Sequence, residues 1–289
     1  FKLCLSDVSD YDYYEGAKDI TSIINSCSAD AAYSVFNSSA DQAKPICSNG
    51  PYYNVWFKFK ATSTKYMKIS LKTGGTEGSI QYPTMTLWDN NAKQLRCFLN
   101  YGQRNINISA DTLIPGNYYY VSVDINNNYT PYRGTFKLCL NDKIDNDYAI
   151  AATDVNSLMN NCSADAAYST VDATPDKTKG TCWGDGPNFN RWFKFTATTS
   201  KFIKITVKTG SPAGTMIYPY LALFDNNLSQ IKCETNYSST GDVELSYYGL
   251  TQGANYFITV DNNSGTTNCG TFKLCLSDVS DYDYYEGAK

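Results

Sequence analysis

Short runs of alternating apolar and polar residues recur along this chain, a pattern typical of β-strands with one buried face. In "FKLCL", for example, Phe272, Leu274 and Leu276 would face one side of a sheet, and the Lys and Cys between them the other. Clusters of Gly, Asn and Pro separate the runs and indicate turns. In the second half of the chain the pattern predicts strands at Arg191–Thr198, Lys201–Thr209, Tyr218–Asp225, Gln230–Glu234, Val243–Tyr247, Tyr256–Asp261 and Thr271–Leu276.

Strands of this length and spacing predict an all-β fold, an antiparallel β-sandwich of the jelly-roll type. A weakly helical pattern is confined to Ala17–Ile24 and Ala152–Met159. The chain has 289 residues, enough for two domains with their own cores.

The chain also contains an internal repeat, which indicates two homologous domains. The segment "NVWFKFKATSTKYMKISLKTG" at Asn54–Gly74 corresponds to "NRWFKFTATTSKFIKITVKTG" at Asn190–Gly210. We therefore predict two tandem β-sandwiches, repeat A at residues 10–141 and repeat B at residues 145–278.

A second level of repetition joins the two ends of the sequence. Phe1–Lys18 is identical to Phe272–Lys289. We interpret residues 1–9 as the last strand of a preceding repeat and residues 279–289 as the start of the next repeat A. The expected period is then a pair of unlike domains in a longer array. Either one giant chain or separate subunits that each donate a terminal strand could build such an array, and the fixed period favours the giant chain.

The amino-acid composition argues against several classes of function. His is absent, which removes the commonest general base and leaves no Ser/His/Asp set. The Gly-rich segments lack the strand–loop–helix context of phosphate loops. The net charge of −4 argues against a nucleic-acid partner, and no apolar run approaches the length of a membrane span. The sequence therefore predicts no enzyme and no membrane insertion.

The ten Cys are scattered singly, so neither a C-x-x-C pair nor a Cys/His zinc site is present. They recur in register with the repeat, which indicates disulfides and an oxidising compartment. Buried free thiols in a cytosolic protein are the alternative.

The order of motifs in each copy resembles a known family. "AAYST", "GP-N-WFKF", "LALFDNN", "YFITVDN" and "GTFKLCL" follow one another in repeat B. This order resembles the pre-peptidase C-terminal type of β-sandwich. It is similar, more closely, to tandem repeats in giant surface and secreted proteins of Bacteroidota, exported by the type IX secretion system and linked to adhesion or gliding motility. The resemblance implies a structural or adhesive repeat unit of an extracellular cell-surface fibre, joined head to tail with neighbouring copies.

The same resemblance implies how the cysteines pair. It predicts the disulfides Cys27–Cys47, Cys97–Cys139, Cys162–Cys182 and Cys233–Cys275. Cys4 would bond to a domain before Phe1. Cys269 would be free or would compete with Cys275 for Cys233.

Acidic residues cluster where one domain follows another. Carboxylates that converge from one segment can hold Ca²⁺, which would stiffen the junction, although no cofactor is required for the fold. The alternative, which we favour, is solvated turn residues and helix N-caps. The candidate ligands are Asp142, Asp145, Asp147, Asp278, Asp281 and Asp283.

Tyrosine-rich stretches suggest the alternative function, a carbohydrate-binding module for extracellular polysaccharide. They lie at Pro51–Tyr53, Asn117–Val123 and Ser246–Tyr248. Ordinary packing of Tyr in strands also accounts for them. Finally, "DTL" around Thr112 resembles the acceptor motif for O-linked glycans in these bacteria, so Thr112 is a candidate glycosylation site.

Overall fold

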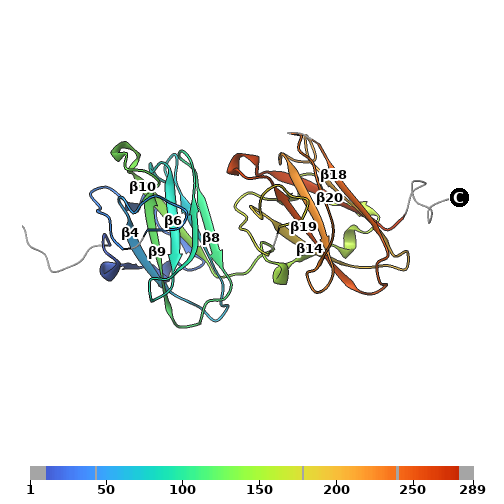
Figure 1. Cartoon of the computed structure of the whole chain (residues 1–289), viewed down its shortest axis with the longest axis horizontal. Coiled ribbons are helices and arrows are strands. Elements are labelled where there is room, and N and C mark those ends of the chain that lie inside the picture. The colour runs from blue at the N-terminus through green and yellow to red at the C-terminus, as the bar shows by residue number, and fades with distance from the viewer. Residues whose placement is uncertain (1–10, 43, 178, 239–240, 280–289) are drawn as a thin grey trace, which may run out of the picture. The chain divides into compact units, whose positions relative to one another are not determined.

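The computed structural model describes residues 11–42, 44–177, 179–238 and 241–279. The chain divides between Ile144 and Asp145 into two compact units, repeat A and repeat B (Figure 1). Both are all-β, as predicted. The predicted terminal segments of neighbouring repeats, residues 1–9 and 279–289, lie almost wholly outside the described residues.

Repeat A is a sandwich of two sheets, with strand orders β1-β4-β9-β6-β7 and β3-β10-β5-β8. Its elements are η1 (Tyr14–Gly16), β1 (Lys18–Asp19), η2 (Thr21–Ile23), β2 (Ser26–Cys27), β3 (Tyr33–Ser34), β4 (Val55–Lys60), β5 (Met67–Lys72), β6 (Pro83–Trp88), β7 (Gln94–Leu99), β8 (Ile106–Ala110), β9 (Tyr118–Ile125), η3 (Thr130–Tyr132) and β10 (Thr135–Asn141).

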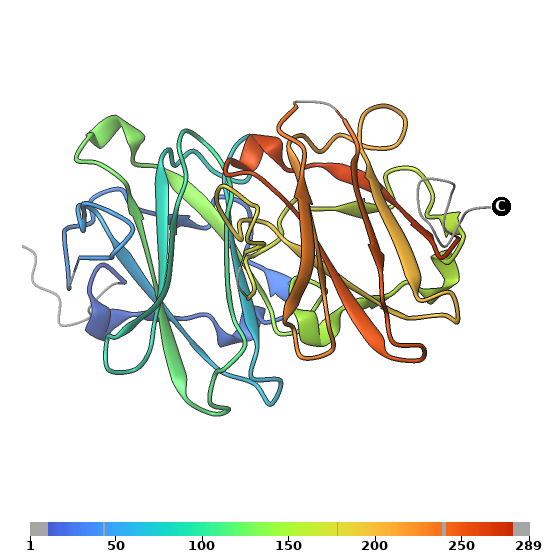
Figure 2. The same cartoon turned by 45° about the vertical axis from the view of Figure 1, so that its right-hand side comes forward.

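The inward residues of the two sheets form the core of repeat A. Phe57 on β4 and Val121 on β9 face Leu71 on β5 and Leu138 on β10, and all four are fully buried. Figure 2 shows the two layers of each sandwich obliquely. The alternation visible in the sequence therefore separates core positions from the outer face, as in other sandwiches.

A second, smaller apolar cluster covers the outer face of the first sheet. Trp56 and Trp88 lie there beneath Ala17, and Tyr14 packs edge-on against Trp56 at 5.2 Å. The predicted helix at Ala17–Ile24 was wrong. The segment instead forms β1, parallel to β4, between two 3₁₀ turns. The sheet edge supplies the hydrogen-bond partners that a helix would have supplied internally.

Repeat B repeats this topology, with sheets β11-β14-β19-β16-β17 and β12-β20-β15-β18, and β13 also pairs with β20. Its elements are η4 (Ala149–Ala151), β11 (Thr153–Asp154), η5 (Asn156–Leu158), β12 (Asn161–Cys162), β13 (Tyr168–Ser169), β14 (Arg191–Thr196), β15 (Phe202–Lys208), β16 (Pro219–Phe224), β17 (Gln230–Thr235), β18 (Val243–Tyr248), β19 (Asn255–Asn262), η6 (Thr266–Asn268) and β20 (Thr271–Ser277).

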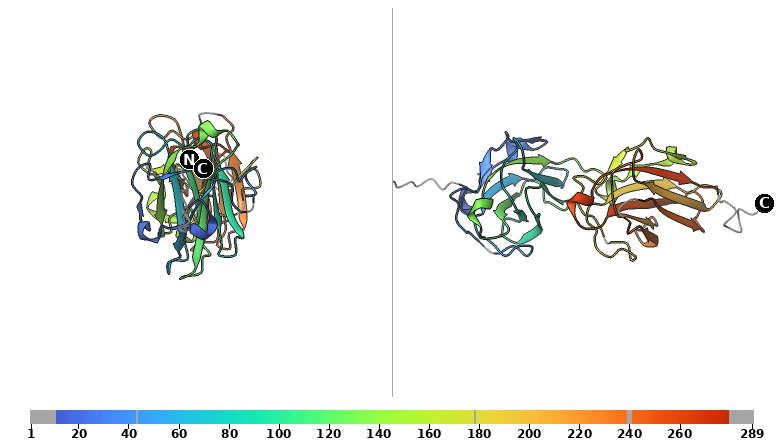
Figure 3. Two further views of the ribbon diagram at one scale, coloured as in Figure 1. Left: turned by 90° about the vertical axis from the view of Figure 1, so that its left-hand side faces the viewer. Right: turned by 90° about the horizontal axis from the view of Figure 1, so that it is seen from above.

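All seven strands predicted for repeat B coincide with β14 to β20, which lie in the yellow-to-red part of the ribbon in Figure 3. The predicted helix at Ala152–Met159 was wrong, because this segment forms β11 against β14 and then η5. The same exchange of helix for short parallel strand therefore occurs in both repeats.

Candidate functional site

A disulfide joins the opening segment of each repeat to its last strand. In repeat A it links Cys27 on β2 to Cys139 on β10, which are 112 residues apart in sequence and 4.0 Å apart between Cα atoms. In repeat B it links Cys162 on β12 to Cys275 on β20, which are 113 residues apart and again at 4.0 Å. We call these two disulfides the clamps. Each clamp ties the opening segment, shortly after its first strand (β1 or β11), to the last strand, where the chain leaves the sandwich.

A second disulfide in each repeat fixes a long loop to an edge strand. Cys47 bonds to Cys97 on β7, and Cys182 bonds to Cys233 on β17. In repeat A the backbone N–H of Ile46 also donates to the side chain of Gln94 at 2.8 Å. The loop thus covers part of the open side of β7, an edge where another chain could otherwise pair.

The eight predicted cysteines are all in disulfides, but all four predicted pairings were wrong. Cys97 lies on an edge strand of the first sheet, whereas Cys139 lies on the second sheet, next to the opening segment that carries Cys27. The observed pairing differs from the predicted one in the same way in repeat B. Spacing along the sequence could not reveal which strands would become neighbours. Cys4 lies outside the described residues.

Cys269 is a free thiol and does not compete for Cys233. It is half-buried near Asn262, whose amide lies 3.8 Å from its sulfur. Burial raises the pKa of the Cys269 thiol to about 12, so it stays protonated at neutral pH. Protonated and sheltered, it has the character of a structural rather than a reactive cysteine.

A buried carboxylate holds the Gly-Pro loop of each repeat. In repeat B, Asp261 on β19 accepts hydrogen bonds from the backbone N–H groups of Asn188, Phe189 and Asn262 at 2.7–2.8 Å. Burial raises its pKa from 3.8 to about 7. Asp124 plays the same part in repeat A, and burial raises its pKa as well. Sequence reasoning missed both, although a carboxylate at the end of an apolar strand was a visible signal.

The acidic junction is organised by an arginine. Asp147 is fully buried, accepts the backbone N–H and hydroxyl of Thr174 at 3.0 and 2.9 Å, and pairs with Arg191. Asp145 lies 3.4 Å from the same guanidinium. Among the residues that the structure describes, no group of three or more Asp, Glu, His or Cys side chains could hold a metal ion.

The remaining candidate calcium ligands are dispersed. Asp142 is bound through its backbone N–H to the side chain of Asn25 at 3.3 Å. The Asp278 carboxylate accepts the Asn160 amide at 2.6 Å. Asp281 and Asp283 lie outside the described residues. Calcium binding at this end of repeat B therefore stays a prediction.

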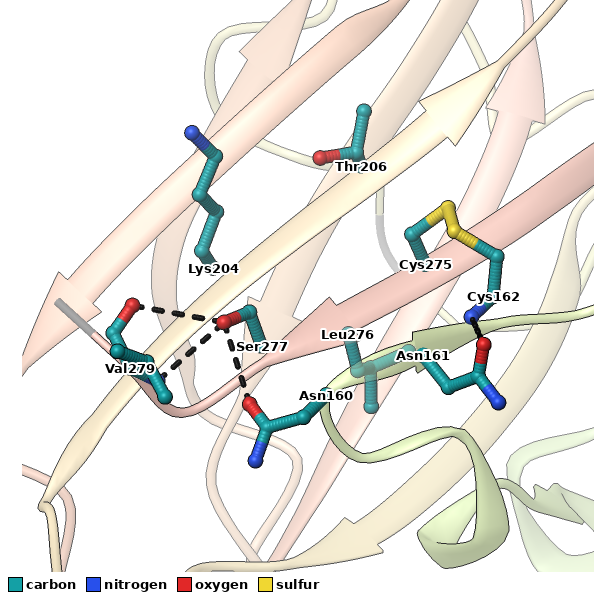
Figure 4. Close-up of a pocket in the computed structure, with 9 residues that line it drawn as sticks. All are labelled: Asn160, Asn161, Cys162, Lys204, Thr206, Cys275, Leu276, Ser277 and Val279. Atoms are coloured by element: carbon teal, nitrogen blue, oxygen red, sulfur yellow. Dashed lines mark hydrogen bonds between the residues drawn. A yellow bond between two sulfur atoms is a disulfide. The ribbon is translucent and has the colours of Figure 1, made fainter. Parts of the chain in front are cut away.

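A hollow of about 350 Å³ lies over the clamp of repeat B (Figure 4). Cys162 and Cys275 form part of its wall, and Lys204 and Thr206 project from β15 beside them. Ser277 donates to Asn160 at 3.3 Å, while Lys204 pairs with Glu244 at 2.9 Å. These groups lack the nucleophile–base geometry of a catalytic site. The hollow does leave the clamp disulfide open to solvent.

The predicted tyrosine stretches divide between core and surface. Tyr119 is buried, while its neighbour Tyr118 is 39% exposed and donates to Asp19 at 3.3 Å. Tyr247 packs on the core of repeat B, and Tyr248 points outward. Thr112 is exposed in a loop that borders a hollow of about 370 Å³. The exposed position of Thr112 leaves room for an O-linked glycan.

No family model and no curated protein matches the chain. Among solved structures, the CBM22-1–CBM22-2 tandem domain of Xyn10C from Paenibacillus barcinonensis is 10% identical, with a TM-score of 0.22 over 76% of this chain and 82% of that one. The tandem CBM51 modules of the Streptococcus pneumoniae family 98 glycoside hydrolase are 9% identical, with a TM-score of 0.21 over 79% and 82%. Allantoicase from Saccharomyces cerevisiae is 12% identical, with a TM-score of 0.22 over 89% and 92%. At these scores the likeness carries no inference about function.

Two further findings bear on where the protein works. The part of the chain that the structure describes holds four disulfides, two within each repeat, and such bonds persist in oxidising surroundings such as the extracellular space. Among the described residues, no helix has the length and apolar character needed to span a bilayer.

Proposed function

We propose that this chain is a structural and adhesive repeat unit of a long extracellular fibre at the cell surface, with neighbouring copies of the same repeat as its partners. Export by the type IX secretion system and a part in gliding motility belong to the same proposal. The observation that carries it is the clamp. Both repeats have one, at the same place in the fold, although their surfaces differ.

A clamp has a specific consequence for a chain under tension. Force enters repeat A through residues 11–26 and leaves after Asn141. The Cys27–Cys139 bond connects those two segments directly. The stretch of chain between the two cysteines, a sequence separation of 112 residues, therefore lies outside the path of the force. The sandwich after Cys27 is thereby shielded, because a covalent bond carries the tension in place of its strand pairings. Only residues 11–26, with the short strand β1, stay in the path of the force.

The disulfides of the edge strands support the same function. Repeats at high local concentration in a fibre are exposed to strand pairing between neighbours. The loop stapled at Cys97 partly covers β7, and the loop stapled at Cys233 partly covers β17 in the same way. Neighbouring units can then stay separately folded.

Force spectroscopy on the full chain, held by its two ends, tests the proposal. In oxidising buffer each repeat should release only the segment before its clamp, about 55 Å for residues 11–26. In reducing buffer each repeat should release about 380 Å more, from the 112 residues in repeat A and 113 in repeat B. Steps of several hundred Å without reductant would refute the shielding.

A matched pair of variants separates the two disulfides. Cys27→Ser with Cys139→Ser should give one added step of about 210 Å from repeat A, because the 50-residue Cys47–Cys97 loop stays closed. Cys47→Ser with Cys97→Ser should leave the short oxidised steps unchanged, since the clamp is intact. A long step in the second variant would contradict the proposal.

The mass of the native polypeptide tests how the repeats of the fibre are joined. A boiled, reduced gel of native material should show a band far above 32.1 kDa if the repeats belong to one giant chain. A ladder that collapses to that mass would instead indicate subunits that exchange terminal strands.

A further inference from the structure

Four tyrosines gather at one end of repeat A and form a surface that we call the tyrosine platform. It consists of Tyr82, Tyr101, Tyr129 and Tyr132. The Tyr82 and Tyr132 ring centroids are 4.4 Å apart, Tyr129 packs edge-on against Tyr132 at 4.8 Å, and Tyr101 packs edge-on against Tyr82 at 6.4 Å. Tyr101 is 64% exposed and Tyr129 is 55% exposed. The outer two rings thus present much of their surface to solvent.

The backbone fixes the positions of these rings. Tyr82 immediately precedes β6, and its N–H donates to the carbonyl of Gly102 at 2.7 Å, beside Tyr101. Tyr132 ends η3, and its carbonyl accepts the N–H of Gln81 at 3.0 Å. Loops before β6, after β7 and before β10 therefore meet here through main-chain hydrogen bonds. Ligand contact would cost little extra ordering, because the rings are already held in place.

The rim of the platform is rich in amides. The Asn127 side chain accepts the N–H of Tyr129 at 2.9 Å, and the Asn128 side chain accepts the hydroxyl of Tyr53 at 2.7 Å. Tyr101 and Asn126 also border a hollow of about 230 Å³, whose other lining residues are Lys44, Ile46, Cys47, Ser48, Asn49 and Leu99. Flat rings beside hydroxyls and amides suit a sugar chain, because the C–H faces of sugars stack on aromatic rings while their hydroxyls need polar partners.

Repeat B provides an internal comparison. Its η6 corresponds to η3, but Gly265, Asn268 and Cys269 stand where repeat A has Tyr129, Tyr132 and Arg133. Arg133 in turn covers the ring of Tyr53 at 4.8 Å, a position that is Phe189 in repeat B. Tyr82 and Tyr101 correspond to tyrosines in repeat B, Tyr218 and Tyr237, and Tyr132 packs against the core of repeat A. Tyr129 is more than half exposed and is Gly265 in repeat B, so the shared fold does not require it. Clustered exposed aromatic rings are a mark of binding sites.

We propose that the tyrosine platform of repeat A binds an extended extracellular polysaccharide, with Tyr101 and Tyr129 stacking on sugar rings. This inference rests on the adhesive part of the proposed function and gives it a location. It assigns the binding to repeat A alone. In the array expected from the sequence, one domain of each pair would adhere and the other would space the sites.

The test is affinity electrophoresis and a microarray of immobilised β-glucan, xylan, mannan, pectin and alginate, with the full 289-residue chain as the probe. We expect at least one polysaccharide to retain the chain. Tyr101→Ala with Tyr129→Ala should weaken that retention by about tenfold or more, as for aromatic anchors at other interfaces. Tyr237→Ala is the matched control, because Tyr237 is 61% exposed at the corresponding place in repeat B.

Equal unfolding temperatures of the three chains would show that the substitutions leave the fold intact. Retention by none of the five polysaccharides, or equal retention of all three chains, would overturn the proposal. So would self-association in ultracentrifugation that disappears in the double variant, which would identify a second copy as the partner. None of these results bears on the clamps, which force spectroscopy tests separately.

Discussion

Arg191 pairs with the fully buried carboxylate of Asp147, and repeat A has Val55 and Asp12 at the two corresponding positions. Asp12 is only half-buried and accepts the N–H and hydroxyl of Ser39 at 2.8 and 3.0 Å. The more deeply buried of the two carboxylates, in repeat B, is thus the one that has an arginine beside it. This is expected because an unpaired buried charge would be costly.

This relationship predicts the outcome of removing the arginine. Arg191→Val, which copies repeat A, should lower the free energy of unfolding of repeat B by about 3 kcal/mol, because it leaves a buried carboxylate without its cation. Adding Asp147→Asn should recover part of that loss. Hydrogen exchange followed by mass spectrometry can report each repeat separately, and repeat A should not change. Equal losses in the single and double variants would mean that the pair is not coupled.

Peptide mapping without reductant checks the disulfides directly. We expect linked peptides containing Cys27 with Cys139, Cys47 with Cys97, Cys162 with Cys275, and Cys182 with Cys233. Removal of one clamp should cost about 4 kcal/mol of stability, because it reopens a loop of more than a hundred residues in the unfolded chain. Recovery of Cys27 linked to Cys47 would contradict the strand arrangement described above.

Asp261 predicts how stability depends on pH. Its pKa is raised from 3.8 to about 7 by burial, so the folded state holds a proton that the unfolded state has lost. Stability should therefore be greatest near pH 4 and fall by about 2–4 kcal/mol as pH rises to 8. His is absent, and no other side chain has an ordinary pKa between about pH 5 and 8.

Denaturant unfolding of repeat B between pH 5 and pH 8 measures this effect. Asp261→Asn should remove most of the slope, although it also weakens the bond to the Asn188 N–H. Asp124 should act in the same direction in repeat A. Asp185, the charged neighbour of Asp261, has a lowered pKa and titrates below this window. A flat profile in the native chain would show that Asp261 is ionised throughout.

Chelation tests whether repeat B binds calcium. Chelation should leave the unfolding temperature of repeat B unchanged, because Arg191 already pairs with both Asp145 and Asp147. A shift on chelation would instead indicate that repeat B binds calcium.

Mass spectrometry of material from the native host should detect any added hexose on the peptide that contains Thr112, and Thr112→Ala should abolish it. An unmodified peptide would remove Thr112 from the candidate sites.

The sequence by itself determined the strands, the duplication and the use of eight cysteines in disulfides. These features are local or periodic: alternation in "FIKITV" at Phe202–Val207 places Ile203, Ile205 and Val207 on a buried face whatever the strand's neighbours are. The duplicated motifs needed no structure either, since they are visible as text.

Only the tertiary structure decided which cysteines pair, where the charges lie and what the tyrosines form. Cys27 meets Cys139 because the opening segment lies against the last strand, a neighbour more than a hundred residues away. The raised pKa of Asp261 is apparent only in the folded chain, where the Gly-Pro loop lies over its carboxylate. Tyr101 and Tyr129 belong to one surface only because three loops end at the same edge of the sandwich. Strand order sets all three relations, and it follows from long-range packing that no local pattern encodes.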